Sequence, residues 1–191
     1  MSIVLVGSTS GSVTLQEQAV SGSTVLDLPA VSGTILTTGS SGQSIPKAAL
    51  PTGSVLQVVN VTYSTSTSTT SGTPVETNLT ASITPLYSSS KILITVFANG
   101  IQKNSGDSNS GVLLYLYKNG SNLRKFGEYV GYTATSQTND VGTAGITYLD
   151  SPATTSSTAY TVYLASNVSG QQVFINAGAE SSTITLMEIA A

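Results

Sequence analysis

The sequence of 191 residues contains no cysteine, no histidine and no tryptophan. Without cysteine and histidine the chain cannot form a disulfide, a thiolate or imidazole metal site, or a Ser–His–Asp or Cys–His catalytic group. Charged side chains are also scarce, with six Lys or Arg, nine Asp or Glu and a formal net charge of −3. We therefore expect a protein that is not an enzyme and that carries no cofactor and no metal.

The features that bind nucleic acid or membranes are missing as well. Phosphate binding needs clustered basic residues, and only Arg124 and Lys125, near Lys118, come close to a cluster. No apolar run approaches the roughly 20 residues of a membrane-spanning helix. Residues 1–6 are too few for a signal peptide and lack its basic start. The sequence predicts no nucleic-acid binding, no membrane insertion and no secretion through a signal peptide.

Small hydroxyl-bearing residues, glycine and β-branched residues fill the sequence instead. Thr and Val favour strands, whereas the residues that favour helices never cluster with a helical period. Composition and alternation together predict an all-β protein.

The first 43 residues carry an eleven-residue repeat. Ser-Gly pairs end at Gly11, Gly22 and Gly33, and strand-like stretches follow at 13–15, 24–28 and 35–37. Such a repeat cannot bury a face of its own, because burial yields about 25 cal/mol per Å² and backbone ordering costs about 1–2 kcal/mol per residue. We expect residues 1–43 to form an extended arm that pairs with copies of itself or with a larger assembly. Residues 44–52, with Pro46 and Pro51, would be the junction.

Residues 53–191 show nine or ten short strand patterns. The strongest apolar stretch is 91–98, and the Asn119-Gly120 dipeptide predicts a two-residue hairpin turn with two positive φ angles. Residues 182–189 predict a terminal strand apolar enough to be paired inside a sheet. The spacing predicts a jelly-roll-like antiparallel β-sandwich.

Some of the weaker patterns within residues 53–191, which we call the head, are ambiguous. Residues 64–71 predict either a loop or an edge strand, and residues 122–126 and 129–132 predict separate strands. The polar stretches 104–110 and 136–140 predict loops.

Four segments of the head, in this order, resemble a module of bacteriophage tail-fibre and virion proteins, including those of cyanobacterial phages. They are SSSKIL at 88–93, LYKNG at 116–120, YLDSPATT at 148–155 and STITLMEIA at 182–190. The arm is similar to the Gly/Ser-rich repeats that precede such modules. The resemblance implies a homotrimeric jelly-roll head on a virion, and it supplies no catalytic residue.

Tyrosines and polar loops are the candidates for a binding site. Tyr115, Tyr117, Tyr148, Tyr160 and Tyr163 lie in strand patterns, where packing in the core or a trimer interface is expected. Tyr129 and Tyr132 lie in a glycine-rich stretch, where they are either receptor contacts or packing residues. The two polar loops offer four further candidate receptor-binding residues, although turn chemistry alone also explains them. These are Asp107, Asn109, Asn139 and Asp140.

Two functions follow from these expectations. The first is a phage fibre protein whose arm anchors it to other virion proteins and whose head binds a host-surface glycan or protein. The second is a capsid or tail decoration protein that stabilises its neighbours without binding a receptor. Both place the protein in the virion.

Overall fold

The computed structural model describes residues 2–6, 12–16 and 50–191. The chain comprises two units, Met1–Ser44 and Ile45–Ala191. In the first unit β1 (Ser2–Val6) pairs antiparallel with β2 (Ser12–Gln16). β2 covers the strand pattern at 13–15, whereas no strand was predicted at its partner β1. The patterns at 24–28 and 35–37 lie outside the described residues, as does most of the junction.

Ten strands lie between residues 50 and 191. They are β3 (Val55–Tyr63), β4 (Thr67–Thr69), β5 (Val75–Ile83), β6 (Lys91–Lys103), β7 (Ser110–Lys118), β8 (Ser121–Thr133), β9 (Asn139–Asp150), β10 (Thr158–Ser166), β11 (Val173–Ile175) and β12 (Ser182–Ile189). A single turn of 3-10 helix at Ala177–Ala179 separates β11 from β12.

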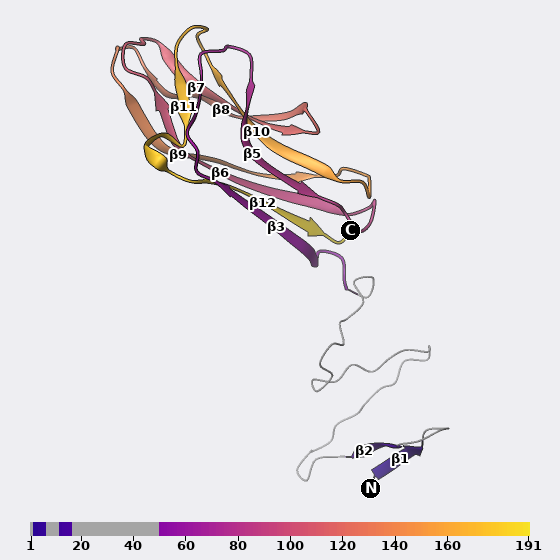
Figure 1. Cartoon of the computed structure of the whole chain (residues 1–191). Helices are drawn as coiled ribbons and strands as arrows, with labels where there is room; N and C mark the ends of the chain where they lie inside the picture. The colour runs from indigo at the N-terminus through magenta and orange to yellow at the C-terminus, as the bar shows by residue number, and fades with distance from the viewer. Residues whose placement is uncertain (1, 7–11, 17–49) are drawn as a thin grey trace. The chain divides into compact units, whose positions relative to one another are not determined.

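The strands form two antiparallel sheets that pack into a β-sandwich (Figure 1). One sheet has the order β5-β10-β7-β8. The other has the order β3-β12-β6-β11-β4, with β9 also paired to β6. The predicted all-β antiparallel sandwich is confirmed at this level. The terminal strand β12 lies between β3 and β6, so the expectation that it is paired inside a sheet is also confirmed.

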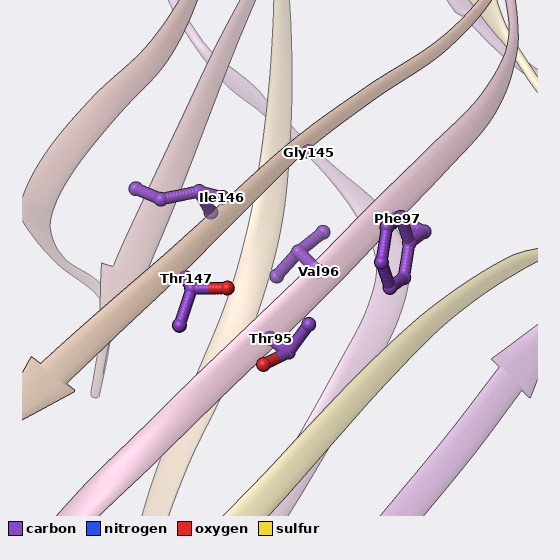
Figure 2. A pocket seen from close by; sticks show the side chains of 6 residues that line it. All are labelled: Thr95, Val96, Phe97, Gly145, Ile146 and Thr147. Carbon is purple, nitrogen blue, oxygen red and sulfur yellow. The ribbon is translucent and has the colours of Figure 1, made fainter.

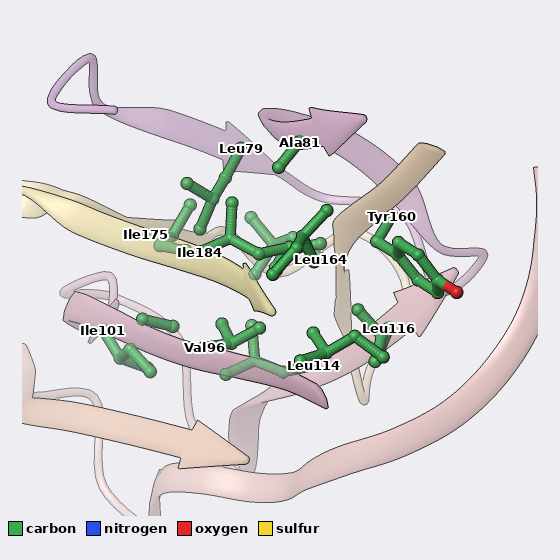
Figure 3. Close-up of a cluster of buried hydrophobic side chains, with 14 of the residues drawn as sticks. Leu79, Ala81, Val96, Ile101, Leu114, Leu116, Tyr160, Leu164, Ile175 and Ile184 are labelled. Carbon is green, nitrogen blue, oxygen red and sulfur yellow. The ribbon is translucent and has the colours of Figure 1, made fainter. Parts of the chain in front are cut away.

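Strict alternation in β6 divides the core from the outer surface. Ile92, Ile94 and Val96 are fully buried, while the residues between them face outward and are at least partly exposed. Because successive side chains of a strand point to opposite faces, the buried ones meet the inner face of the other sheet. Figure 3 shows this core, in which Leu114, Leu164 and other side chains from both sheets are interleaved.

The hairpin between β7 and β8 has the predicted turn. Lys118 pairs with Ser121, and the two residues between them have φ angles of 47° at Asn119 and 77° at Gly120. Asn and Gly tolerate this left-handed backbone better than other residues. Asn119 also accepts a hydrogen bond from the Ala159 amide through its Oδ1 atom, which ties the turn to the start of β10.

Two local predictions are wrong, and the alternative left open for residues 64–71 is decided in favour of an edge strand. Residues 122–126 and 129–132 belong to one long strand, β8, and residues 139 and 140 begin β9 instead of ending a loop. Residues 64–71 contain the three-residue edge strand β4. Of the five tyrosines expected to pack in the core or in a trimer interface, Tyr160 is fully buried in the core and the other four are half-buried. Alternation assigned these side chains to faces but could not say which face of each strand is inside.

Polar contacts between the two sheets fix one end of the sandwich. The Asp150 carboxylate, at the end of β9, accepts hydrogen bonds from Lys118 Nζ at 2.9 Å and from Tyr160 Oη at 2.7 Å. Burial and the bond to Asp150 raise the pKa of the Tyr160 hydroxyl above its ordinary value, so it remains a donor. The sheets are thereby held together by a charge pair at a position where aliphatic packing ends.

Glu188 in β12 is a fully buried carboxylate. Burial by itself raises the pKa of this carboxyl. Hydrogen-bond donors around the carboxylate together have the larger effect and hold its pKa below the ordinary value of 4.5. They include Gln57 Nε2, 2.5 Å from Oε2, and the Leu86 amide, 2.7 Å from Oε1. The Ser90 hydroxyl also lowers this pKa. The charged carboxylate thus organises the loop between β5 and β6.

Glu188 makes the stability of the head depend on pH. Its folded-state pKa lies below the unfolded value, so its contribution is present at neutral pH and is lost as pH falls through the folded pKa, below about 4.5. We expect Glu188→Gln to lower the free energy of unfolding at pH 7 and to flatten its decline between pH 5 and pH 3, measured by urea unfolding. Glu180→Gln, at an exposed carboxylate, is the control and should leave the profile unchanged. If the free energy of unfolding of the Glu188→Gln variant depended on pH as it does in the unsubstituted chain, this role would be contradicted.

Candidate functional site

Two tyrosines of β8 form the most exposed aromatic pair of the head. Tyr129 is 53 % exposed and Tyr132 is 46 % exposed, and both line a hollow in the surface. Their ring centroids lie 6.2 Å apart with an interplanar angle of 81°, an edge-to-face arrangement. The two rings therefore present two apolar surfaces at nearly a right angle.

Two β-bulges present these rings. Val112 and Leu114 are two residues apart on β7, but their partners Val130 and Gly127 are three residues apart on β8. The same mismatch recurs between Val130 and Thr133. Each bulge adds one unpaired residue and redirects the side chains around it. Tyr129 lies within the first bulge and Tyr132 within the second.

The backbone of Tyr129 is strained. Its φ angle is 53°, a region that bulky residues rarely adopt and that costs about 1–3 kcal/mol. Gly111 on β7 permits the conformation, because a Cβ atom there would lie 3.0 Å from the Tyr129 Cα atom. Such strain persists only where the surrounding structure imposes it, and it is concentrated at functional sites.

Two of the predicted polar residues accompany the tyrosines. The Tyr132 hydroxyl donates to Asn109 Oδ1 at 2.9 Å, and Asn139 Nδ2 donates to the Gly131 carbonyl at 3.0 Å. Asn109 has a φ angle of 59° and is exposed, so the loop before β7 holds its side chain against the ring. The structure brings these two asparagines to the tyrosine pair, as a site made of rings and amides requires.

Asp107 and Asp140 have partners elsewhere. Asp107 Oδ2 accepts from the Gln172 amide at 2.7 Å, and Asp140 Oδ1 accepts from Gln102 Nε2. The loop of Asp107 is held further by Lys103, whose fully buried Nζ atom lies 2.5 Å from the carbonyl oxygens of both Asp107 and Thr135. Asp107 thus holds the loop before β7, and Asp140 joins the start of β9 to β6.

The carboxylates of the head do not gather into one site. Asp150 pairs with Lys118, and Glu128 pairs with Lys125 at 2.5 Å. Within residues 2–6, 12–16 and 50–191 no three acidic side chains come close enough to hold a metal ion. The same residues include no helix long and apolar enough to cross a membrane.

Comparison with models of protein families and with curated proteins finds no match for this chain.

Sequence reasoning missed what positions the tyrosine pair. Neither the two bulges nor the buried Lys103 was foreseen, although the close spacing of Gly127 and Gly131 was a usable signal. Gly127 packs against Leu114, where a Cβ atom would lie 3.0 Å from the leucine Cβ. Gly131 has a φ angle of 71°. Glycines at such intervals in a strand indicate bulges and close backbone approach.

Gly131 should tolerate substitution less well than Gly120, although both have positive φ angles. An added Cβ atom at Gly131 would lie 2.7 Å from Val141 Cγ2, whereas nothing lies within 4 Å at Gly120. Gly120→Ala should therefore lower the free energy of unfolding by about 1–2 kcal/mol through backbone strain alone. Gly131→Ala should lower it by about 1 kcal/mol more, because it adds overpacking. Urea unfolding of both variants measures the difference, and equal losses would contradict the close contact.

Proposed function

We propose that the chain is a structural fibre protein of a bacteriophage virion whose head binds carbohydrate on the host surface. In this proposal the head is a jelly-roll-like sandwich, three chains form a homotrimer, and residues 1–43 attach the trimer to other virion proteins. The observation that carries the binding function is the exposed edge-to-face pair of Tyr129 and Tyr132. The four segments that resemble phage virion modules support the setting.

The chemistry of the pair suits a sugar better than a charged ligand. A pyranose has an apolar face that packs on an aromatic ring and hydroxyls around its edge, and tyrosine offers both kinds of contact at low entropic cost. Asn109 Oδ1 holds the Tyr132 hydroxyl, and the amide nitrogen of the same side chain is a donor suited to a sugar hydroxyl. Lys125 and Glu128, which precede Tyr129 on β8, form an ion pair with each other.

The strain at Tyr129 supports the same proposal. Ordinary packing does not require a tyrosine with a φ angle of 53°, and the ring remains more than half exposed after this cost. The strained backbone lowers the stability of the chain and leaves an apolar ring exposed. Contact between this ring and a ligand would explain why the conformation is kept.

Carbohydrate binding should depend on both rings. We expect Tyr129→Ala and Tyr132→Ala each to reduce binding to an array of bacterial surface polysaccharides about tenfold or more, with unchanged circular dichroism. The control is Tyr87→Ala, at another exposed tyrosine outside the pair, which should bind as the parent does. Binding should change little between pH 5.5 and 8, because the chain has no histidine, and little with salt, because its contacts are neutral.

Two outcomes would contradict this function. Undiminished binding in both tyrosine variants would place the ligand elsewhere. Absence of carbohydrate binding by the parent, together with normal assembly into virions, would favour a decoration protein that stabilises capsid or tail neighbours.

A further inference from the structure

Lys103, the last residue of β6, is fully buried although it carries a charge. Its Nζ atom donates hydrogen bonds to the carbonyl oxygens of Asp107 and Thr135, both at 2.5 Å, and of Thr133 at 3.3 Å. An ammonium group has three hydrogens to donate, so these three carbonyls take up its full capacity. Burial of a charge is costly unless hydrogen bonds replace its water. The three carbonyl groups therefore form a site for one cation, which the chain supplies itself.

The three carbonyl groups belong to two loops that cross between the sheets. Asp107 lies in the loop from β6 to β7, whereas Thr133 ends β8 and Thr135 lies in the loop from β8 to β9. β6 and β9 belong to the six-stranded sheet, and β7 and β8 belong to the four-stranded sheet. One buried ammonium group thus binds both crossings at the same end of the sandwich.

The same contacts adjoin the residues that hold the tyrosine pair. Thr133 directly follows Tyr132, and its carbonyl also accepts a hydrogen bond from the Asn109 amide at 2.9 Å. The Asn109 side chain accepts from the Tyr132 hydroxyl at 2.9 Å. The backbone of Lys103 pairs with Asn139, whose side chain donates to the backbone of β8 between the two tyrosines at 3.0 Å. Lys103 is therefore one residue removed from every polar contact of the pair.

We propose that Lys103 is the positioning residue of the tyrosine pair. Its ammonium group binds the loop that leads to Asn109 and the strand end that carries Tyr132, and so keeps the amide and the ring together before a ligand arrives. A site already held in its binding conformation pays less ordering entropy when it binds. The inference rests on the proposed carbohydrate site, although it concerns what holds the site and not which sugar it takes.

Lys118 offers a matched control for the loss of a lysine. It pairs with the buried Asp150 carboxylate and lies at the end of β7 that is distant from Ser110, the partner of Thr133. At about 3.4 Å per residue, the two ends of β7 lie about 27 Å apart. Removing Lys118 leaves a buried carboxylate without its cation, which should lower the stability of the sandwich without moving the tyrosine pair.

Phe97 offers a control for the place where the sugar binds. It is an exposed ring of β6 and borders a hollow of about 290 Å³, which Thr95 and Thr147 also line (Figure 2). The loops that Lys103 binds contribute no residue to this lining. A sugar bound in this hollow would therefore depend on Phe97 and not on Lys103.

Binding is tested with Lys103→Met, which keeps the length of the side chain and removes its charge. We expect its affinity for the surface polysaccharide that the parent chain binds best to fall about tenfold, because the loops must then be ordered on binding. Lys118→Met and Phe97→Ala should bind as the parent does, and urea unfolding of both methionine variants shows whether a loss of stability alone reduces binding. Parental affinity in Lys103→Met, or an equal loss in Lys118→Met, would overturn the inference.

Amide hydrogen exchange tests the loops without any sugar. The amides of Gly106 and Asn109 each donate a hydrogen bond from the first loop to the segment after Tyr132, at 2.9 Å. In Lys103→Met we expect both to exchange at least tenfold faster than in the parent, whereas the Asn119 amide, bonded at the other end of β7, keeps its rate. Unchanged exchange at both positions would overturn the inference. A parent that binds no polysaccharide but shows the faster exchange in this variant would contradict only the proposed function.

The charge can also be restored at this one position, because the chain has no cysteine of its own. Lys103→Cys is unfolded, alkylated with 2-bromoethylamine and refolded, which gives a side chain of the length of lysine that ends in an ammonium group. Alkylation with 2-bromoethanol gives the same length without charge. We expect only the ammonium form to regain the slow exchange of the parent carried through the same steps. Equal recovery in both forms would show that shape holds the loops, and would overturn the inference.

Discussion

Strand β6 fixes the register on which the rest of the head depends. It pairs with β12 on one side and with β9 on the other, and it sends Ile92, Ile94 and Val96 into the core. A slip of one residue would turn these side chains outward and bring Thr95 and Phe97 inside. The same pairing therefore creates the aliphatic core and, on its reverse side, the outer face that carries Thr95 and Phe97.

Three buried ionic groups fix regions that hydrophobic packing leaves undetermined. Glu188 holds the loop between β5 and β6, Asp150 joins the two sheets, and Lys103 binds the backbone of the loops beside the tyrosine pair. Burying a charge is costly unless it is compensated by hydrogen bonds, and all three have several.

The sequence predicted features that depend on local chemistry or on long periodic stretches. Alternation located β6 and β12, and the Asn119-Gly120 dipeptide predicted its turn because few residues accept two positive φ angles. The tyrosine pair was proposed because it lies in a glycine-rich stretch, and its geometry was not predictable. It depends on bulges in β8, which arise from register against β7 and so from contacts distant in sequence. For the same reason alternation could not tell that Tyr115 and Tyr163 face outward while Tyr160 is buried.

The tyrosine pair lies where β8 of one sheet runs beside β9 of the other. Tyr129 and Tyr132 belong to β8, at the edge of the four-stranded sheet, and Asn139, which donates to the Gly131 carbonyl, begins β9 of the six-stranded sheet. A site of two rings and one amide binds a sugar weakly, but linked sites gain effective concentration without new contacts. In the proposed trimer, three such sites would together give firm attachment although each site is weak and neutral.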